Sequence, residues 1–299
     1  MSASNQLIVV GVDGSDASEQ AVRWAAAVAS GRNLELRIVH ALKDGELYYG
    51  GDLAGTRALL EQAQKSAEQI VQDAVQIASL VDKDLTITTD FPTEPPVPLL
   101  IELSRDARMV VVGHTGRGGF PGMLAGSTAV ALASHADCPV AVIRGRFGPV
   151  VRPEVGPVVV GVDDSPNSDQ AIAMAFDEAS RRDVPLVALH AWTDVSYLEP
   201  HGVAPLAVTS ELLEEGEQRL LAQRLAGWQE KYPDVEVQRE IVRARPRHAL
   251  LDWSAKAQLV VVGSRGRGGF RGMLLGSTSQ ALVSHAQCPV LVARPRPGE

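Results

Sequence analysis

The residues with the clearest chemical meaning form a glycine-rich loop that occurs twice. Each copy has the spacing Gly-x2-Gly-x9-Gly-Ser, and the two copies are identical at 11 of 15 positions. Their fixed positions are Gly113, Gly116, Gly126 and Ser127, and, 150 residues later, Gly263, Gly266, Gly276 and Ser277. Each loop follows an apolar run of strand length and ends where a helix-like stretch begins. Backbone N–H groups of such a loop, together with a helix N-terminus, are suited to binding phosphate.

Each loop also supplies a second hydroxyl group and a cation. These further ligand candidates are Thr128 and Arg117 in the first copy, and Thr278 and Arg267 in the second. A helix dipole contributes only about 0.3–1 kcal/mol at an exposed site, so tight phosphate binding needs several N–H groups and a positive charge. The second loop carries Arg265, Arg267 and Arg271, whereas the first carries Arg117 alone. This difference predicts tighter phosphate binding in the second copy, most strongly at low salt.

The repeat extends over the whole chain. Residue pairs with the same offset of 150 are Asp13 and Asp163, His40 and His190, Pro96 and Pro246, and Cys138 and Cys288. A unit of this length has the size of one compact domain. We therefore expect a first domain at 1–146, a Pro- and Gly-rich linker at 147–156, and a second domain at 157–299.

Alternation of apolar runs with helical patterns predicts an α/β fold with helices on both faces of a mostly parallel sheet. In the first unit the expected strands are 7–12, 34–41, 85–90, 108–113 and 139–144, and the expected helices are 16–31, 56–80, 96–105 and 127–135. Gly31 is predicted to end the first helix. Ligands of such sheets bind at the carboxyl ends of the strands, where Asp13, Ala41 and the glycine loop all lie.

Composition excludes several other classes. A net charge of −8 and a pI near 5.4 argue against a mainly nucleic-acid-binding surface. The sequence shows neither an apolar run long enough for a membrane span nor a signal peptide, and two cysteines do not make a disulfide framework. A cytoplasmic protein is expected. His135 with Cys138 and His285 with Cys288 resemble metal ligands, but each unit has only two, so no metal site is predicted.

The glycine spacing, together with Asp13 in Val-Gly-Val-Asp, resembles the universal stress protein family, in its ATP-binding, tandem two-domain form. The resemblance implies two Rossmann-like domains, each with five parallel strands. It implies phosphate contacts from the glycines and serines of both loops. It places Asp13 and Asp163 near the adenosine, and the backbone at Ala41 and Ala191 near the adenine. Family members that bind no nucleotide lack the glycine pattern, which this chain has.

The sequence therefore favours an ATP-binding protein with a regulatory or nucleotide-sensing role in the stress response. Two alternatives remain, a slow ATP hydrolase and a nucleotide-free interaction module. No catalytic residue is predicted, because no side chain is clearly a water-activating base; Mg²⁺ on the triphosphate is compatible with the site. By the same resemblance, the fifth strands, Pro139–Arg144 and Pro289–Arg294, are candidates for contacts between domains or between the chains of a homodimer. The protein partner is not identifiable, and no nucleic-acid or membrane partner is expected.

Overall fold

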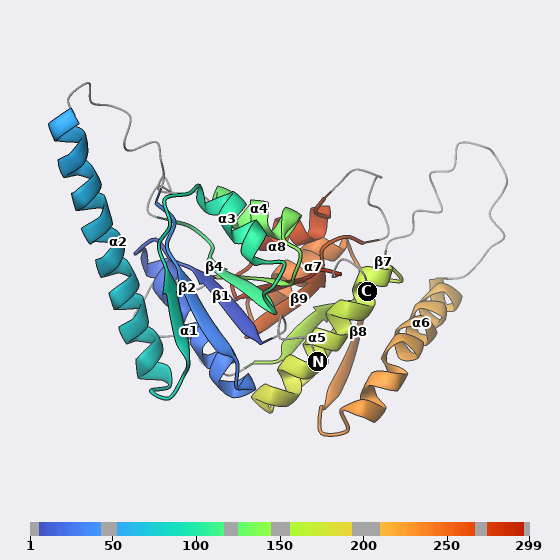
Figure 1. Ribbon diagram of the computed structural model, residues 1–299. Helices are drawn as coiled ribbons and strands as arrows, with labels where there is room; N and C mark the ends of the chain where they lie inside the picture. The colour runs from blue at the N-terminus through green and yellow to red at the C-terminus, as the bar shows by residue number, and fades with distance from the viewer. Residues whose placement is uncertain are drawn as a thin grey trace, which may run out of the picture. The chain divides into compact units, whose positions relative to one another are not determined.

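The structure is a computed structural model that describes residues 6–42, 53–116, 125–144, 156–192, 210–266 and 274–295. The chain divides into two compact units, the first comprising Met1–Gly145 together with Arg294–Glu299 and the second Arg146–Ala293. Each unit alternates strands and helices in the same order, so the predicted α/β class is confirmed (Figure 1). The predicted linker, 147–156, lies almost wholly outside the described residues.

The first unit contains a parallel sheet with the strand order β3-β2-β1-β4-β5. Its elements are β1 (Leu7–Gly11), α1 (Asp16–Arg32), β2 (Glu35–Val39), α2 (Leu53–Val81), β3 (Ile87–Asp90), α3 (Pro96–Leu103), β4 (Met109–Gly113), α4 (Ser127–His135) and β5 (Val140–Ile143). All five strands had been expected from their apolar runs. The order reverses between β1 and β4, which makes the carboxyl ends of these two strands the topological switch point.

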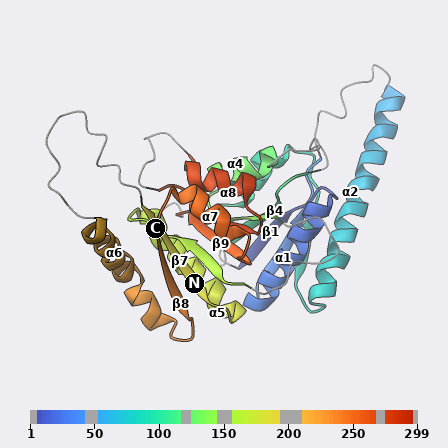
Figure 2. The same cartoon turned by 180° about the vertical axis from the view of Figure 1, so that it is seen from behind.

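The second unit repeats this topology with the parallel order β8-β7-β6-β9-β10. Its elements are β6 (Val158–Gly161), α5 (Pro166–Arg182), β7 (Leu186–Trp192), α6 (Ser210–Lys231), β8 (Val237–Arg243), α7 (Pro246–Ser254), β9 (Leu259–Gly263), α8 (Ser277–His285) and β10 (Val290–Ala293). Figures 1 and 2 show these elements from opposite sides. The switch point of this unit lies between β6 and β9.

The strands at the switch points, such as β1 and β4, are apolar throughout because helices cover both faces of each sheet, whereas the edge strands β3 and β8 carry polar residues. In the first unit α1 packs against α2 and the strands, while α3 packs against α4. Right-handed crossovers require this distribution, since the first two crossovers run in one direction and the last two in the other. Among the described residues, no helix combines the length and apolar character needed to cross a membrane.

The ends of α1 explain one error in the sequence prediction. Ser15 is the N-cap, and its hydroxyl accepts a hydrogen bond from the backbone N–H of Ser18 at 3.3 Å. The helix does not stop at Gly31 but continues to Arg32, and Asn33 caps it in the left-handed conformation with φ 51°. Asn tolerates this conformation better than most side chains, so no glycine is required. Asp183 caps α5 in the same way, also with φ 51°.

Candidate functional site

A cavity of about 560 Å³ lies at the switch point of the first unit. The sequence-predicted site residues of this unit that the structure describes all line it: Asp13, Ala41, Gly113, Gly116, Gly126, Ser127 and Thr128. Arg117 falls outside the described residues, as does Arg267 in the second unit. The structure therefore brings together residues from the ends of β1, β2 and β4 and from the start of α4 around one hollow.

The cavity changes in character from one side to the other. Near β2 its wall includes apolar side chains of Leu42 and of Ala67 and Ile70 on α2. Near β4 it is lined by the loop residues Gly113, Gly116 and Gly126 and by the hydroxyl-bearing residues Ser127 and Thr128. Adjacent strands are about 4.8 Å apart, so β2 and β4, on either side of β1, are about 10 Å apart. A ligand that fills the cavity thus meets an apolar wall at one end and backbone and hydroxyl donors at the other.

Asp13 lies between these two ends, two residues after β1. Its Oδ1 accepts hydrogen bonds from the hydroxyl of Ser15 at 2.6 Å and from the backbone N–H of Ser15 at 3.1 Å. Its Oδ2 lies against the α-carbon of Gly116, where a Cβ atom would collide with it. Ser15 thereby fixes the carboxylate, and the missing side chain of Gly116 makes room for it. The Asp-x-Ser spacing was the sequence signal for this support, and the sequence analysis missed it.

The start of α4 provides the polar end of the cavity. Gly126 is the N-cap, and no side chain caps the helix there. The N–H of Gly126 donates to the carbonyl of His114 at 2.6 Å, which joins the described residues on either side of the loop. The next N–H groups of α4 are among those that a helix cannot satisfy internally, so they remain suitable donors to an anion. The start of α1 is a less suitable anion site, because the Ser15 hydroxyl already accepts a hydrogen bond from one of its N–H groups.

Gly113 has a packing role that the sequence analysis did not predict. A Cβ on this residue would lie 2.7 Å from the carbonyl carbon of Ala17 and 2.8 Å from its oxygen. The glycine therefore lets the first turn of α1 approach the end of β4. In the second unit a Cβ on Gly263 would lie 3.0 Å from Asn167 Cβ, a less severe contact. The glycine pattern thus combines packing and ligand-binding requirements.

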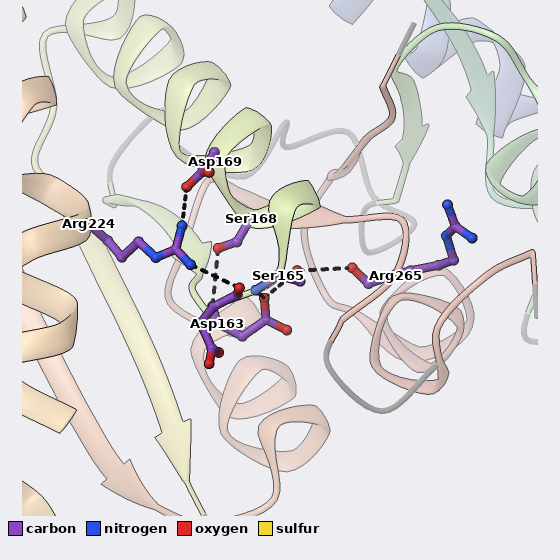
Figure 3. A network of polar contacts seen from close by, with 7 residues as sticks. Asp163, Ser165, Ser168, Asp169, Arg224 and Arg265 are labelled. Carbon is purple, nitrogen blue, oxygen red and sulfur yellow. Dashed lines mark hydrogen bonds and ion pairs between the residues drawn. The ribbon is translucent and has the colours of Figure 1, made fainter. Parts of the chain in front are cut away.

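The second unit builds a similar polar arrangement around Asp163 (Figure 3). Asp163 Oδ1 accepts from the Ser165 backbone N–H at 3.0 Å and from its hydroxyl at 2.5 Å. Ser168 Oγ accepts a hydrogen bond from the backbone N–H of Asp163 at 3.1 Å. A Cβ on Gly266 would lie 2.5 Å from Asp163 Oδ2. The relation between the aspartate and the loop glycine therefore holds in both units.

The structure describes further predicted residues of the second site and corrects the position of one of them. Gly276 is the N-cap of α8, which begins with Ser277 and Thr278, and its N–H donates to the Ser264 carbonyl at 2.8 Å. Ala191 does not follow the second strand of this unit but lies within it, because β7 pairs with β8 up to Trp192 and aligns Ala191 with Val242.

Arg265 is exposed, and its backbone carbonyl accepts from Asn167 Nδ2 at 3.1 Å. In Figure 3 its guanidinium extends away from Asp163. Arg271 lies outside the described residues. The arginine-based prediction of a tighter second site therefore has no support from the described side chain.

His40, which follows β2, and His190, which lies within β7, have clear structural contacts. The Nδ1 atoms of His40 and His190 lie 2.8 Å from the carbonyl oxygens of Val12 and Val162. These contacts with the backbone give both rings a structural role. Burial, together with the positive charge of Arg144, lowers the pKa of His114, which is only 8% exposed. Ser264 stands at the equivalent position of the second unit.

The cysteines that follow the histidines of α4 and α8 are core residues. Cys138 and Cys288 are 1% and 3% exposed, and each sulfur lies 3.5 Å from the carbonyl oxygen of the next proline. Across the described ranges, His, Cys, Asp and Glu side chains form no group of three or more that could hold a metal ion.

Comparisons with known proteins agree with this architecture. The family model for the universal stress protein family matches residues 5–144 and 154–294. Universal stress protein Rv2005c of Mycobacterium tuberculosis is 45% identical over 291 residues, which cover 96% of each chain. Universal stress protein Rv2623 of the same organism is 43% identical over 290 residues, again covering 96% of each chain.

The solved structures include a universal stress protein from Archaeoglobus fulgidus with a TM-score of 0.70 and 20% identity. The match covers 98% of this chain and 97% of that one, and at this identity it supports the fold alone. Two matches to one family model, together with relatives similar over almost their whole length, establish the family. The chain therefore belongs to the universal stress protein family, with two copies of its domain in tandem.

Proposed function

We propose that this protein binds adenine nucleotides, ATP foremost, and uses the bound nucleotide as a regulatory signal in the stress response. The observation that carries the proposal is the cavity of about 560 Å³ across the ends of β2, β1 and β4. Its apolar wall suits an adenine, Asp13 is placed to accept hydrogen bonds from a ribose, and the start of α4 suits phosphates. The chain has the family's glycine pattern, which supports ATP as the ligand.

The same lining supports binding rather than rapid hydrolysis. Among the described residues around the cavity, Asp13 is the one carboxylate, and Ser15 holds its Oδ1. Hydrolysis requires a group that positions or deprotonates the attacking water near the terminal phosphate. Asp13 lies after β1, toward the middle of the cavity, and is better placed for the ribose. We therefore infer slow turnover at most. Mg²⁺ bound to the triphosphate would reduce the negative charge near the loop.

A regulatory protein of this kind is proposed to act in the cytoplasm as a homodimer. Its output would be a change in partner binding when the nucleotide binds or leaves. Sedimentation at micromolar concentration tests the assembly, and a monomeric mass contradicts it.

Two measurements test nucleotide binding. Heat denaturation of the purified protein, followed by chromatography and mass spectrometry, should release an adenine nucleotide. Protein stripped of nucleotide should then melt at a higher temperature with Mg-ATP, since a ligand at about 100 times its dissociation constant stabilises the fold by about 2.7 kcal/mol. No released nucleotide and no shift at millimolar ATP would overturn the proposal in favour of an interaction module without nucleotide.

A further inference from the structure

Helix α6 of the second unit makes a polar contact next to the predicted adenine end of its site. Glu217 Oε2 lies 2.8 Å from His190 Nε2, and the two side chains are 25% and 1% exposed. The other ring nitrogen, Nδ1, lies 2.8 Å from the carbonyl oxygen of Val162. A carbonyl only accepts, so Nδ1 carries a proton, and the Nε2 contact holds a further proton between the ring and the carboxylate. Glu217 is therefore fixed above the end of β7.

A second polar contact lies on the same face of α6. Arg224 is seven residues beyond Glu217, which is two turns of helix. Its Nη1 donates to Asp169 Oδ1 at 2.8 Å, and its Nη2 donates to the backbone carbonyl of Asp164 at 2.9 Å (Figure 3). This side chain joins α6 to α5 and to the segment after β6. Two side chains thus hold α6 against the carboxyl-end side of its unit.

The first unit has alanine at both equivalent positions. Ala67 stands where Glu217 does, and it lines the cavity of about 560 Å³ together with His40. Ala74 stands where Arg224 does, and it lines a neighbouring hollow of about 280 Å³ together with Gly14 and Glu19. Gly14 and Glu19 are the equivalents of Asp164 and Asp169, the two partners of Arg224.

The histidines show the consequence of this difference. His40 lines the cavity of the first unit and is partly exposed, whereas His190 is 1% exposed beneath Glu217. A glutamate side chain is larger than an alanine methyl group and brings a carboxylate close to the predicted nucleotide. Removing it from His190 would break a hydrogen bond that involves a charged group, which costs free energy.

We propose that Glu217 makes the two sites unequal, so that the first site binds ATP more tightly and the second accepts it only when Glu217 leaves His190. The proposal rests on the proposed nucleotide-binding function. It reverses the expectation drawn from the arginines of the second loop. Glu217 thus lowers the affinity of the second site for ATP, and Arg224 helps to hold α6 in the position that Glu217 requires.

The test is calorimetric titration of nucleotide-stripped protein with Mg-ATP. Asp13→Asn weakens the first site and leaves the second to be measured. In that background, Glu217→Ala, which supplies the residue type found at Ala67, should strengthen the second site about tenfold, the effect of one hydrogen bond to a charged group. Glu217→Gln keeps the size of the side chain but removes its charge, so it separates steric from electrostatic effects. Glu214→Ala is the matched control, because Glu214 is an exposed acid on the same helix.

The outcomes are distinguishable. A weaker second site in the parent that strengthens in Glu217→Ala but not in Glu214→Ala supports the inference. Two equal sites in the parent, or no change in Glu217→Ala, overturn it while leaving the nucleotide-binding function intact. Absence of ATP binding in the parent and in all variants overturns the function and this inference together. The reciprocal variant Ala67→Glu should weaken the first site, and its melting curve without ATP shows whether it folds.

Discussion

The carboxylate of Asp13 occupies the space that a side chain on Gly116 would need. Asp163 and Gly266 repeat the relation, with Oδ2 2.5 Å from the position of a Cβ. In each unit the aspartate follows the first strand, and the glycine lies in the loop after the fourth strand. The two sequence motifs are thus parts of one arrangement, in which the loop glycine allows the aspartate to reach the cavity.

The first prediction uses this coupling. Gly116→Ala should displace the Asp13 carboxylate, and Asp13→Asn should remove one acceptor while keeping Oδ1 for Ser15. Each should weaken ATP at the first site by about 10- to 150-fold, the effect of losing a hydrogen bond to a charged group. Because both act on one carboxylate, the double variant should be little worse than either single variant. Titration calorimetry on all three gives the comparison, and additive losses would show that Gly116 acts independently of Asp13.

The second prediction separates packing from binding among the glycines. Gly113→Ala should lower the free energy of unfolding by about 1–3 kcal/mol, because the new methyl group meets the Ala17 backbone. Gly126→Ala should cost only about 0.5 kcal/mol, as alanine is a slightly poorer N-cap and its Cβ would be 3.4 Å from the nearest atom, the His114 oxygen. Urea denaturation without nucleotide measures both. Equal destabilisation by the two variants would contradict the packing role of Gly113.

The third prediction concerns pH. Since burial and Arg144 lower the pKa of His114 in the folded protein, the unfolded chain binds more protons near the unperturbed value of about 6.5. The stability from the neutral ring is therefore complete above that pH and declines as the pH falls below it. The variant His114→Ser carries the residue type that the second unit has at the equivalent position, Ser264. Between pH 7.5 and 5.5 its free energy of unfolding should fall less than that of the parent. Urea midpoints at both pH values decide this, and identical losses would contradict it.

Much of the fold could be predicted from the sequence because its signals are local. Runs such as Met109–Gly113 are apolar enough to predict a strand that is covered on both faces. Because the sequence repeats, the elements predicted in one unit also supported those predicted in the other. The end of α1 was placed at Gly31, although Asn33 takes the left-handed conformation. Glycine is the commonest residue for that position, but sequence alone does not show which neighbour adopts it.

The candidate site was less predictable where it depends on contacts between distant segments. The glycine spacing indicated a phosphate-binding loop, but it could not show that Gly113 also accommodates Ala17 or that Gly116 accommodates Asp13. The sequence also could not predict that Ala67 lines the cavity, because an alanine on a long helix has no functional group that would mark it as a site residue. Its importance appears only in the structure, through the contrast with Glu217.

Photolabelling of nucleotide-free protein with 2-azido-ATP, followed by mapping of the labelled peptides, tests directly whether the nucleotide binds in the first cavity. The label should fall on residues of the adenine end of the first cavity, around Ala41 or on the Ala63–Ile70 face of α2. Excess ATP should abolish the labelling, and Asp13→Asn should reduce it. Labelling that ATP does not prevent, or that falls only on peptides away from this cavity, would contradict the assignment of the nucleotide to the ends of β2, β1 and β4.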